Sequence, residues 1–322
     1  MGMTEESYPI SGQDYPQTFQ EFDKWFETED KCREYIKKLR WQHGFRCPYC
    51  DLHDEPWITA RDNLRCRGCR NEISITAGTI FESTRKPLRD WFFAMWFVTS
   101  QKYGANALGL QRVLGLRSYQ TAWTWLHKMR RAMVIPGRNQ LTGTVEIDET
   151  FVGAPEENVY GRGTGKKAIV VVAAEVRGKA TGRIRLRKIE EASAENLIPF
   201  IKASICEGAL VVTDGWQGYT GLQNNGYQHE IKNIKQRGKK PHELLPHVHR
   251  VDSLLKRWLD GMLQGGVQQR HLDYYLDEFT FRFNRRTSRS RGLLFYRLMQ
   301  QAVMTCSTPY RGLIGGKDAP MN

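Results

Sequence analysis

Four cysteines in the N-terminal third of the chain stand in two close pairs, Cys47-Pro-Tyr-Cys50 and Cys66-Arg-Gly-Cys69. Two residues between cysteines let both thiolates of a pair face one ion from a tight turn, and two such turns complete a tetrahedral sulfur cage that suits Zn²⁺. The fifteen residues between the pairs are typical of a zinc ribbon. Because thiolates fill every position, we predict a structural zinc site; an iron–sulfur centre and four unrelated buried cysteines are the alternatives.

Two aspartates are associated with apolar strands further along the chain. Asp148 lies in VEIDETFVG, where apolar and acidic residues alternate, and Asp214 directly follows the apolar run LVVT. A carboxylate at such a position is costly unless it has a partner. Metal ligation would supply one, and helix capping or a salt bridge is the alternative. With a further ligand from a later helix, the pair would fit a site that holds two divalent ions for phosphoryl transfer.

The elements around these aspartates predict a mixed α/β domain. After a strand around residues 145–148, we predict strands at 168–176 and 183–189, a helix near 194–204 and a strand at 210–213. Helices at 251–263 and 272–283 follow. The order strand, strand, strand, helix, strand, helix is typical of an α/β domain with a mixed sheet and flanking helices.

The region at residues 87–132 is predicted to be helical. Gly115 separates a helix at about 105–114 from one at about 118–133, for which Ser118 is a suitable N-cap. This pattern favours a helix-turn-helix, with an ordinary helical hairpin as the alternative. The residues predicted to face inward are Leu108, Leu110, Val113 and Leu114 from the first helix and Ala122, Trp125, Leu126 and Met129 from the second. The residues predicted to face a DNA groove are Gln120, Thr124, Lys128 and Arg131.

Charge indicates a polyanionic partner. The net charge is +13 and the pI is near 9.4, which usually means nucleic acid, although a merely basic or ribosome-associated surface is the alternative. At residues 281–292, five arginines interleave with aromatics, and we single out Arg285 and Arg286 as DNA-binding candidates. No run reaches the roughly 18 apolar residues that would span a bilayer, and the N-terminus lacks the pattern of a secretory signal. We therefore expect a cytoplasmic protein with no membrane partner.

Several segments resemble the motifs of a known enzyme family. VEIDETFVGA, VVTDGWQGY, HVHRVDSLLKRWLDG and YLDEFTFRFNRR are similar to those of bacterial insertion-sequence transposases of the DDE superfamily. The two CxxC pairs and SYQTAWTWLHKMR match its zinc-ribbon-bearing group, the insertion sequence fifteen-ninety-five family, so the resemblance runs from about residue 19 to 295. It implies a ribonuclease-H-like catalytic domain that nicks DNA and transfers strands with two Mg²⁺ or Mn²⁺ ions.

The resemblance also implies a set of metal ligands. Asp148 and Asp214 would be the first and second ligands, and His249 would be the third. The superfamily has Glu at the third position, but the family that this chain resembles tolerates Asn or His there. Mg²⁺ prefers oxygen ligands, so a histidine there is unusual. Asp252 would share a helix face with His249 and is the alternative third ligand.

Two basic residues follow in the same predicted helix. Lys256 lies seven residues after His249, which matches the family's basic residue after the third ligand. Lys256 and Arg257 would contact phosphate oxygens as positive anchors, with a solvated basic helix face as the alternative.

We therefore predict five segments: a polar tail at 1–16, a helical lead-in and zinc ribbon at 17–85, a helix-turn-helix-like DNA-binding region at 86–137, the catalytic domain at 138–300 and a C-terminal tail at 301–322. By resemblance, the protein is a transposase that binds the inverted-repeat ends of its element and target DNA, as a nucleoid-associated dimer or larger assembly.

Two other functions are kept as alternatives. A catalytically inactive, transposase-derived DNA-binding protein is the first, because the third ligand is not Glu. A ribonuclease-H-like nuclease or Holliday-junction enzyme without strand transfer is the second, and the long N-terminal region argues against it.

Overall fold

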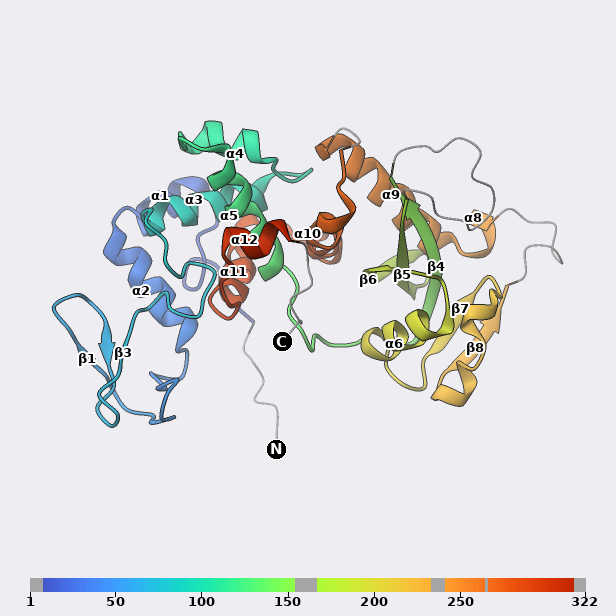
Figure 1. Ribbon diagram of the computed structural model, residues 1–322, viewed down its shortest axis with the longest axis horizontal. Coiled ribbons are helices and arrows are strands. Elements are labelled where there is room, and N and C mark those ends of the chain that lie inside the picture. The colour runs from blue at the N-terminus through green and yellow to red at the C-terminus, as the bar shows by residue number, and fades with distance from the viewer. Residues whose placement is uncertain (1–7, 154–166, 233–240, 264–265, 316–322) are drawn as a thin grey trace. The chain divides into compact units, whose positions relative to one another are not determined.

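Two structural units share the chain, and the second is inserted into the sequence of the first (Figure 1). The computed structural model describes residues 8–153, 167–232, 241–263 and 266–315. Unit 1 comprises Met1–Ile135 and Ser288–Leu313, and unit 2 comprises Pro136–Thr287 and the chain from Ile314. Within the described ranges, every helix is too short or too polar to cross a membrane.

Unit 1 is mainly helical. Side-chain caps start several of its helices: Thr18, Thr28 and Asn106 each accept a hydrogen bond from a backbone N–H three residues later, which satisfies a donor that the first turn leaves open. Gly115 ends the first helix of the predicted helix-turn-helix at φ 60°, a conformation that glycine adopts without strain. The elements are α1 (Phe19–Trp25), α2 (Glu29–Arg40), β1 (Trp57–Ile58), β2 (Leu64–Arg65), β3 (Glu72–Ile73), α3 (Leu88–Ser100), α4 (Ala107–Leu114), α5 (Tyr119–Ala132), α11 (Arg291–Ala302) and α12 (Tyr310–Ile314).

An aromatic core holds unit 1 together, and its centre comes from the far end of the sequence. Phe295 of α11 is fully buried, and its ring centroid lies 5.4 Å from that of Phe22 and 5.7 Å from that of Phe26. Phe92 of α3 completes the group at 4.8 Å from Phe26. Such tilted and edge-to-face pairs add to the free energy gained by burying the rings.

The position of α11 differs from the predicted segments. The sequence analysis assigned residues 288–300 to the catalytic domain and 301–322 to a tail, whereas Ser288–Leu313 belongs to unit 1. Ala302 O accepts a hydrogen bond from Ile80 N, and Lys128 Nζ donates to Ser307 Oγ, so this stretch is tied to unit 1 by polar contacts as well. Apolar spacing along a helix shows which face is buried but not which core it joins.

Unit 2 is built on a mixed five-stranded sheet in the order β6-β5-β4-β7-β8. The first three strands of unit 2, β4, β5 and β6, pair antiparallel. β7 then pairs parallel with β4, and β8 pairs parallel with β7. This confirms the predicted mixed α/β, ribonuclease-H-like class. The elements are β4 (Thr144–Val152), β5 (Ala168–Arg177), β6 (Ala180–Ile189), α6 (Ala194–Ser204), β7 (Leu210–Thr213), η1 (Gln217–Tyr219), η2 (Gln223–Asn225), β8 (Gln228–Ile231), α8 (Pro241–Leu244), α9 (Pro246–Leu263), η3 (Gln269–His271) and α10 (Leu272–Asn284).

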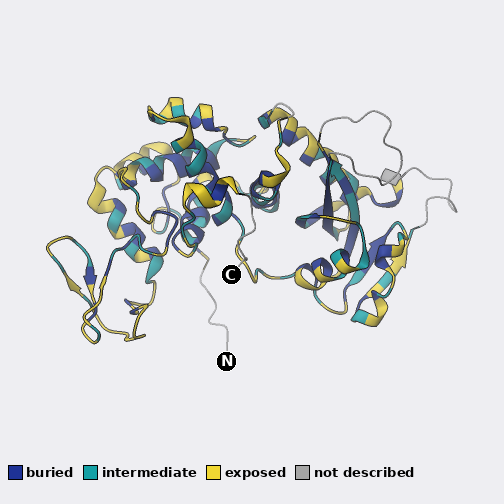
Figure 2. Ribbon diagram, viewed as in Figure 1, coloured by how far each residue is buried: buried dark blue, intermediate teal, exposed yellow. Residues whose placement is uncertain are grey.

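Helices cover both faces of this sheet. Even-numbered residues of β5, such as Val170 and Val172, pack with Leu255 of α9 and Phe279 of α10. The odd-numbered residues of β5 pack on the other face with α6. Figure 2 shows β5 buried along most of its length, and this explains its unbroken apolar run.

Sequence patterns missed the edge strand β8. Three of its four residues (Gln228–Ile231) are exposed and the fourth is half-buried. The strand therefore lacks the apolar run that marked β7. It is held instead by backbone pairing with Leu210–Thr213.

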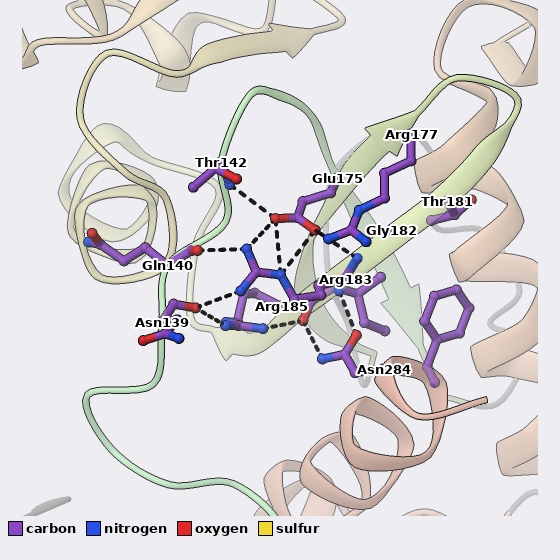
Figure 3. A network of polar contacts seen from close by, with 12 residues as sticks. Asn139, Gln140, Thr142, Glu175, Arg177, Thr181, Gly182, Arg183, Arg185 and Asn284 are labelled. Atoms are coloured by element: carbon purple, nitrogen blue, oxygen red, sulfur yellow. Dashed lines mark hydrogen bonds and ion pairs between the residues drawn. The ribbon is translucent and has the colours of Figure 1, made fainter. Parts of the chain in front are cut away.

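A buried polar network fastens β5 to β6 (Figure 3). Glu175 is 2% exposed and accepts hydrogen bonds from the backbone N–H groups of Thr142 and Arg183, both at 3.0 Å, and from the Arg183 guanidinium. Gly182 is required here, because a Cβ at that position would lie 2.8 Å from the Glu175 Cβ. Burial alone would raise the pKa of Glu175, but the hydrogen bonds and charge of Arg183 outweigh it and lower that pKa to about 2.

We predict that this carboxylate stabilises unit 2 in a pH-dependent way. Since the folded pKa lies below the ordinary 4.5, the stabilisation is fully present above about pH 5 and is lost as the pH falls toward 2. Glu175→Gln should lower the free energy of unfolding at pH 7 by about 2–3 kcal/mol, somewhat below the roughly 3–5 kcal/mol of a fully buried pair, because Arg183 is partly exposed. Denaturation midpoints from pH 7 to pH 3 measure this. An equal acid-induced loss in the variant and the wild type would contradict it.

Candidate active site and metal centre

The four cysteines lie on two similar turns of unit 1, on either side of β1 and β2. In each turn the first cysteine's carbonyl accepts the N–H of the residue four positions later, which is Asp51 in one turn and Arg70 in the other. Asp51 and Arg70 both have φ 62°. The same backbone geometry therefore occurs twice and directs two thiols inward from each side.

The thiols are arranged as a tetrahedral metal requires. All four sulfur atoms lie within 4.8 Å of one another, with 3.6 Å between Cys47 and Cys69 and 3.5 Å between Cys50 and Cys66. A tetrahedral zinc with Zn–S bonds of about 2.3 Å needs sulfur atoms roughly 3.8 Å apart. A backbone hydrogen bond from Asn71 lowers the pKa of Cys69 to about 7, which favours the thiolate. The donor set thus fits a structural Zn²⁺.

Asp148 and Asp214 come together in unit 2 through the parallel pairing of β4 and β7. The register pairs Val145 with Val211 and Glu146 with Val212, so Asp148 and Asp214 stand at the same level two residues further on. Residues paired in this way share a face of the sheet, and neighbouring strands are about 4.8 Å apart. Asp148 lies on the face that α9 covers, and besides burial the charges of both carboxylates raise the pKa of Tyr219.

The backbone around Asp214 presents its side chain at the end of β7. Its Oδ1 accepts the N–H of Trp216 at 2.9 Å, which fixes the carboxylate beside the turn. Gly215 has φ 86°, and a Cβ there would lie 2.6 Å from Ile231 Cγ2. A glycine directly after the aspartate is therefore needed to turn the chain without a clash.

His249 of α9 completes the cluster. Its Nε2 lies 3.7 Å from Asp148 Oδ2, and the two side chains are 26% and 16% exposed, so both remain accessible to a ligand. The three predicted ligands thus come from β4, β7 and the helix that covers them. Asp148 and His249 lie close enough to share a ligand, whereas the four cysteines are the group of described residues whose ligand atoms all lie within 4.8 Å of one another.

Asp252, the alternative third ligand, has other partners. Its carboxylate accepts a hydrogen bond from Thr150 Oγ1 of β4 and forms an ion pair with Lys256, at 3.0 Å from Nζ. This carboxylate therefore ties α9 to β4 and anchors Lys256. Arg257, the next residue, is exposed.

A buried tyrosine borders the cluster. Tyr219 is fully buried and its hydroxyl donates to Glu149. Burial, and then the charges of Glu149, Asp148 and Asp214, raise the pKa of Tyr219 well above its ordinary value, so it stays protonated. Sequence spacing gives no sign of this role for Tyr219, because only the fold brings it to the aspartates.

The predicted helix-turn-helix forms as α4 and α5, but several predicted side-chain directions are wrong. Leu108 and Val113 were expected to be buried and are 44% and 49% exposed. In α5, the four residues expected to pack inward do so: Ala122, Trp125, Leu126 and Met129. Ser118 is the N-cap residue, but its side chain makes no capping hydrogen bond.

The predicted DNA-facing side of α5 is partly covered. Lys128 donates hydrogen bonds to Ile80 O at 3.3 Å and to Ser307 Oγ at 2.9 Å, and burial lowers its pKa. Its ammonium group is therefore engaged by other residues of unit 1, which disfavours the predicted contact with a DNA groove. Gln120 is exposed, whereas Thr124 and Arg131 are half-buried.

Arg285 and Arg286, also predicted to bind DNA, face the protein itself. The Arg286 guanidinium donates to the carbonyls of Thr181, Gly182 and Phe283. Each guanidinium also stacks on an aromatic ring, at 4.1 Å from the centroids of Phe281 and Phe283. Both arginines thus fasten the end of α10, and because Arg286 is also exposed, their contact with phosphate stays a prediction.

We predict that the ribbon depends on its metal. Its three strands have two residues each, so little apolar surface stabilises them, and structural zinc supplies on the order of 10 kcal/mol in such cases. Cys66→Ser should release zinc and make residues 41–76 sensitive to protease, while unit 2 stays resistant. Zinc content and limited proteolysis measure this, with the exposed cysteine variant Cys306→Ser as the control. A zinc-free ribbon that stays protected would show that the metal is dispensable.

Comparisons with known proteins agree with both sites. Residues 27–72 match the model of a transposase zinc-ribbon domain, and residues 140–284 match the model of an ISXO2-like transposase domain. An uncharacterized protein in transposable element ISH50 of Halobacterium salinarum is 26% identical over 280 residues, which cover 79% of this chain and 90% of that protein. The first match contains all four cysteines, and the second contains Asp148, Asp214 and His249. The chain therefore carries a transposase zinc-ribbon domain at residues 27–72 followed by an ISXO2-like transposase domain at residues 140–284.

Proposed function

We propose that this protein cuts the DNA at the inverted-repeat ends of its own element and joins the freed 3′-hydroxyls to target DNA, with Asp148, Asp214 and His249 as the metal-binding residues. The observation that carries the proposal is the approach of His249 Nε2 on α9 to Asp148 Oδ2 on β4, at 3.7 Å, with Asp214 directly after β7, the parallel neighbour of β4. The match to a transposase domain supports the same reaction class.

The three metal-binding residues have different roles in the proposed phosphoryl transfer. Two Mg²⁺ or Mn²⁺ ions, when bound, would activate the attacking oxygen and stabilise the leaving one. Asp148 and Asp214 offer oxygen donors at a separation that the sheet fixes, and His249 offers a nitrogen donor from the facing helix. A nitrogen ligand suits Mn²⁺ better than Mg²⁺, so we expect higher activity with Mn²⁺.

Asp252 and Lys256 act together in this proposal. The ion pair holds the ammonium group in the same helix, two turns beyond His249, where it can contact a phosphate oxygen of the bound strand. Arg257, which is exposed, offers a second phosphate contact. These cations bind and orient the strand, and they need not transfer protons.

DNA recognition is proposed for unit 1 and is supported by the net charge of +13 and the transposase zinc ribbon. Gln120, at the exposed start of α5, remains a candidate contact, whereas Lys128 does not. Two element ends must be handled together, so we propose that a dimer or larger assembly forms on DNA.

We predict that Asp148→Asn, Asp214→Asn and His249→Ala each lower strand cleavage by more than a hundredfold, beyond the roughly 10–100-fold usual for outer-shell partners of a metal. Asp252→Asn should cost less than about tenfold, because the amide still accepts from Thr150. Cleavage and strand transfer on DNA carrying the element's ends, with Mg²⁺ or Mn²⁺, measure this.

The same variants separate the competing functions. All four should bind the element's ends as the wild type does, since none lies in unit 1. An active His249→Ala with an inactive Asp252→Asn would transfer the third ligand to Asp252. Zinc-loaded wild type that binds but never cuts would favour a DNA-binding protein. Cleavage without joining, even with a supplied 3′-hydroxyl end, would favour a nuclease.

A further inference from the structure

A buried glutamate next to the cluster contacts the beginning of α9. Glu146 of β4 is 2% exposed, and its Oε2 accepts the backbone N–H of His247 at 2.7 Å and that of Val248 at 3.0 Å. These two N–H groups belong to the first turn of α9, where the helix itself provides no acceptors. A negative charge at this end is also favoured by the helix dipole.

The same turn is held from a second strand. The His247 side chain is 8% exposed, and its Nδ1 lies 3.0 Å from the Thr181 hydroxyl of β6. The first turn of α9 is therefore held at two points, by the Glu146 carboxylate on β4 and by the Thr181 hydroxyl on β6. Together these contacts fix the position of the turn along the helix axis and its rotation about that axis. His249 is one residue beyond Val248, so its direction follows from this anchoring.

Three positions of β4 face α9 in succession. Glu146, Asp148 and Thr150 alternate onto one face of the strand, as the period of two requires. Opposite them are the first turn of α9, then His249, then Asp252. The contact between Asp148 and His249 thus lies between two hydrogen-bonded contacts of β4 with α9, one at Glu146 and one at Thr150.

We propose that Glu146 is a positioning residue, which holds the first turn of α9 so that His249 stands opposite Asp148. It does not touch a substrate and acts through His249. This inference rests on the proposed function for its catalytic consequence but not for the structural one. A carboxylate that only filled space in the core would leave the helix start and the metal-binding geometry unchanged when replaced by its amide.

Hydrogen exchange and metal binding test the proposal without any DNA. Glu146→Gln keeps the volume and one acceptor oxygen but loses the charge, and Glu146→Ala removes both. In metal-free protein, the amides of residues 247–250 should exchange at least about tenfold faster in Glu146→Gln. Mn²⁺ affinity at the cluster, measured by electron paramagnetic resonance against an Asp148→Asn blank, should fall about tenfold in Glu146→Gln and further in Glu146→Ala.

Glu175→Gln is the matched control. Glu175 is an equally buried carboxylate of the same sheet that also accepts two backbone N–H groups, but those lie on Thr142 and Arg183 and not on α9. This variant should lose stability yet keep the wild-type exchange at residues 247–250 and the wild-type Mn²⁺ affinity. If Glu175→Gln changes them as much as Glu146→Gln does, general loosening of the sheet is the cause and the proposal is wrong.

A double-mutant cycle then connects Glu146 to His249. Because Glu146 acts through His249, adding Glu146→Gln to His249→Ala should lower cleavage by less than twofold beyond His249→Ala alone. Additive losses would overturn the proposal, as would unchanged exchange and Mn²⁺ affinity in Glu146→Gln. If wild type neither binds Mn²⁺ through Asp148 nor cuts DNA, the proposed function fails, and exchange at residues 247–250 still decides whether Glu146 holds α9.

Discussion

A carboxylate that is buried in a sheet needs a hydrogen-bond donor or a positive charge beside it. In unit 2 this requirement determines how α9 packs on the sheet. β4 is the central strand, so its acidic side chains are buried, as Glu146 is, or half-buried, as Asp148 is. Glu146 is matched by the N–H groups that open α9, and Asp148 faces His249. Glu175 on β5 is matched by Arg183. Moving α9 would leave a charge buried without its partner, so the interactions that fix the fold also fix the cluster.

Much of this arrangement follows from local patterns. Spacing of cysteines is a property of a few consecutive residues, and the apolar runs of β5 and β7 report burial on both faces, so these features were predictable. β8 was not predictable, because it is an edge strand whose pairing with β7 uses backbone groups that every sequence has. The role of Glu146 was hidden for a related reason. An acidic residue beside an aspartate in an alternating strand looks solvent-facing until the helix that covers it is placed.

The region of α4 and α5 shows the limit of helical spacing. Residues four apart share a face, and this correctly grouped the inward side of α5. Spacing does not say what else approaches that helix. The side chain that meets Lys128 belongs to Ser307, which is 179 residues away in sequence. Spacing also does not show which acceptors lie near Arg285 and Arg286. Their basic character suggested DNA, but their guanidinium groups donate to carbonyls of β6 and of α10.

The return of α11 to unit 1 has a consequence for the order in which the protein can fold during translation. The rings of Phe22, Phe26 and Phe92 have left the ribosome long before Phe295, which packs against all three. Until then their apolar faces lack a cover, while unit 2, whose sequence lies in between, can already complete its sheet. The zinc-bearing half is therefore the last to be finished, although its synthesis starts first. A chain that ends before α11 therefore has a unit 1 whose aromatic core lacks Phe295.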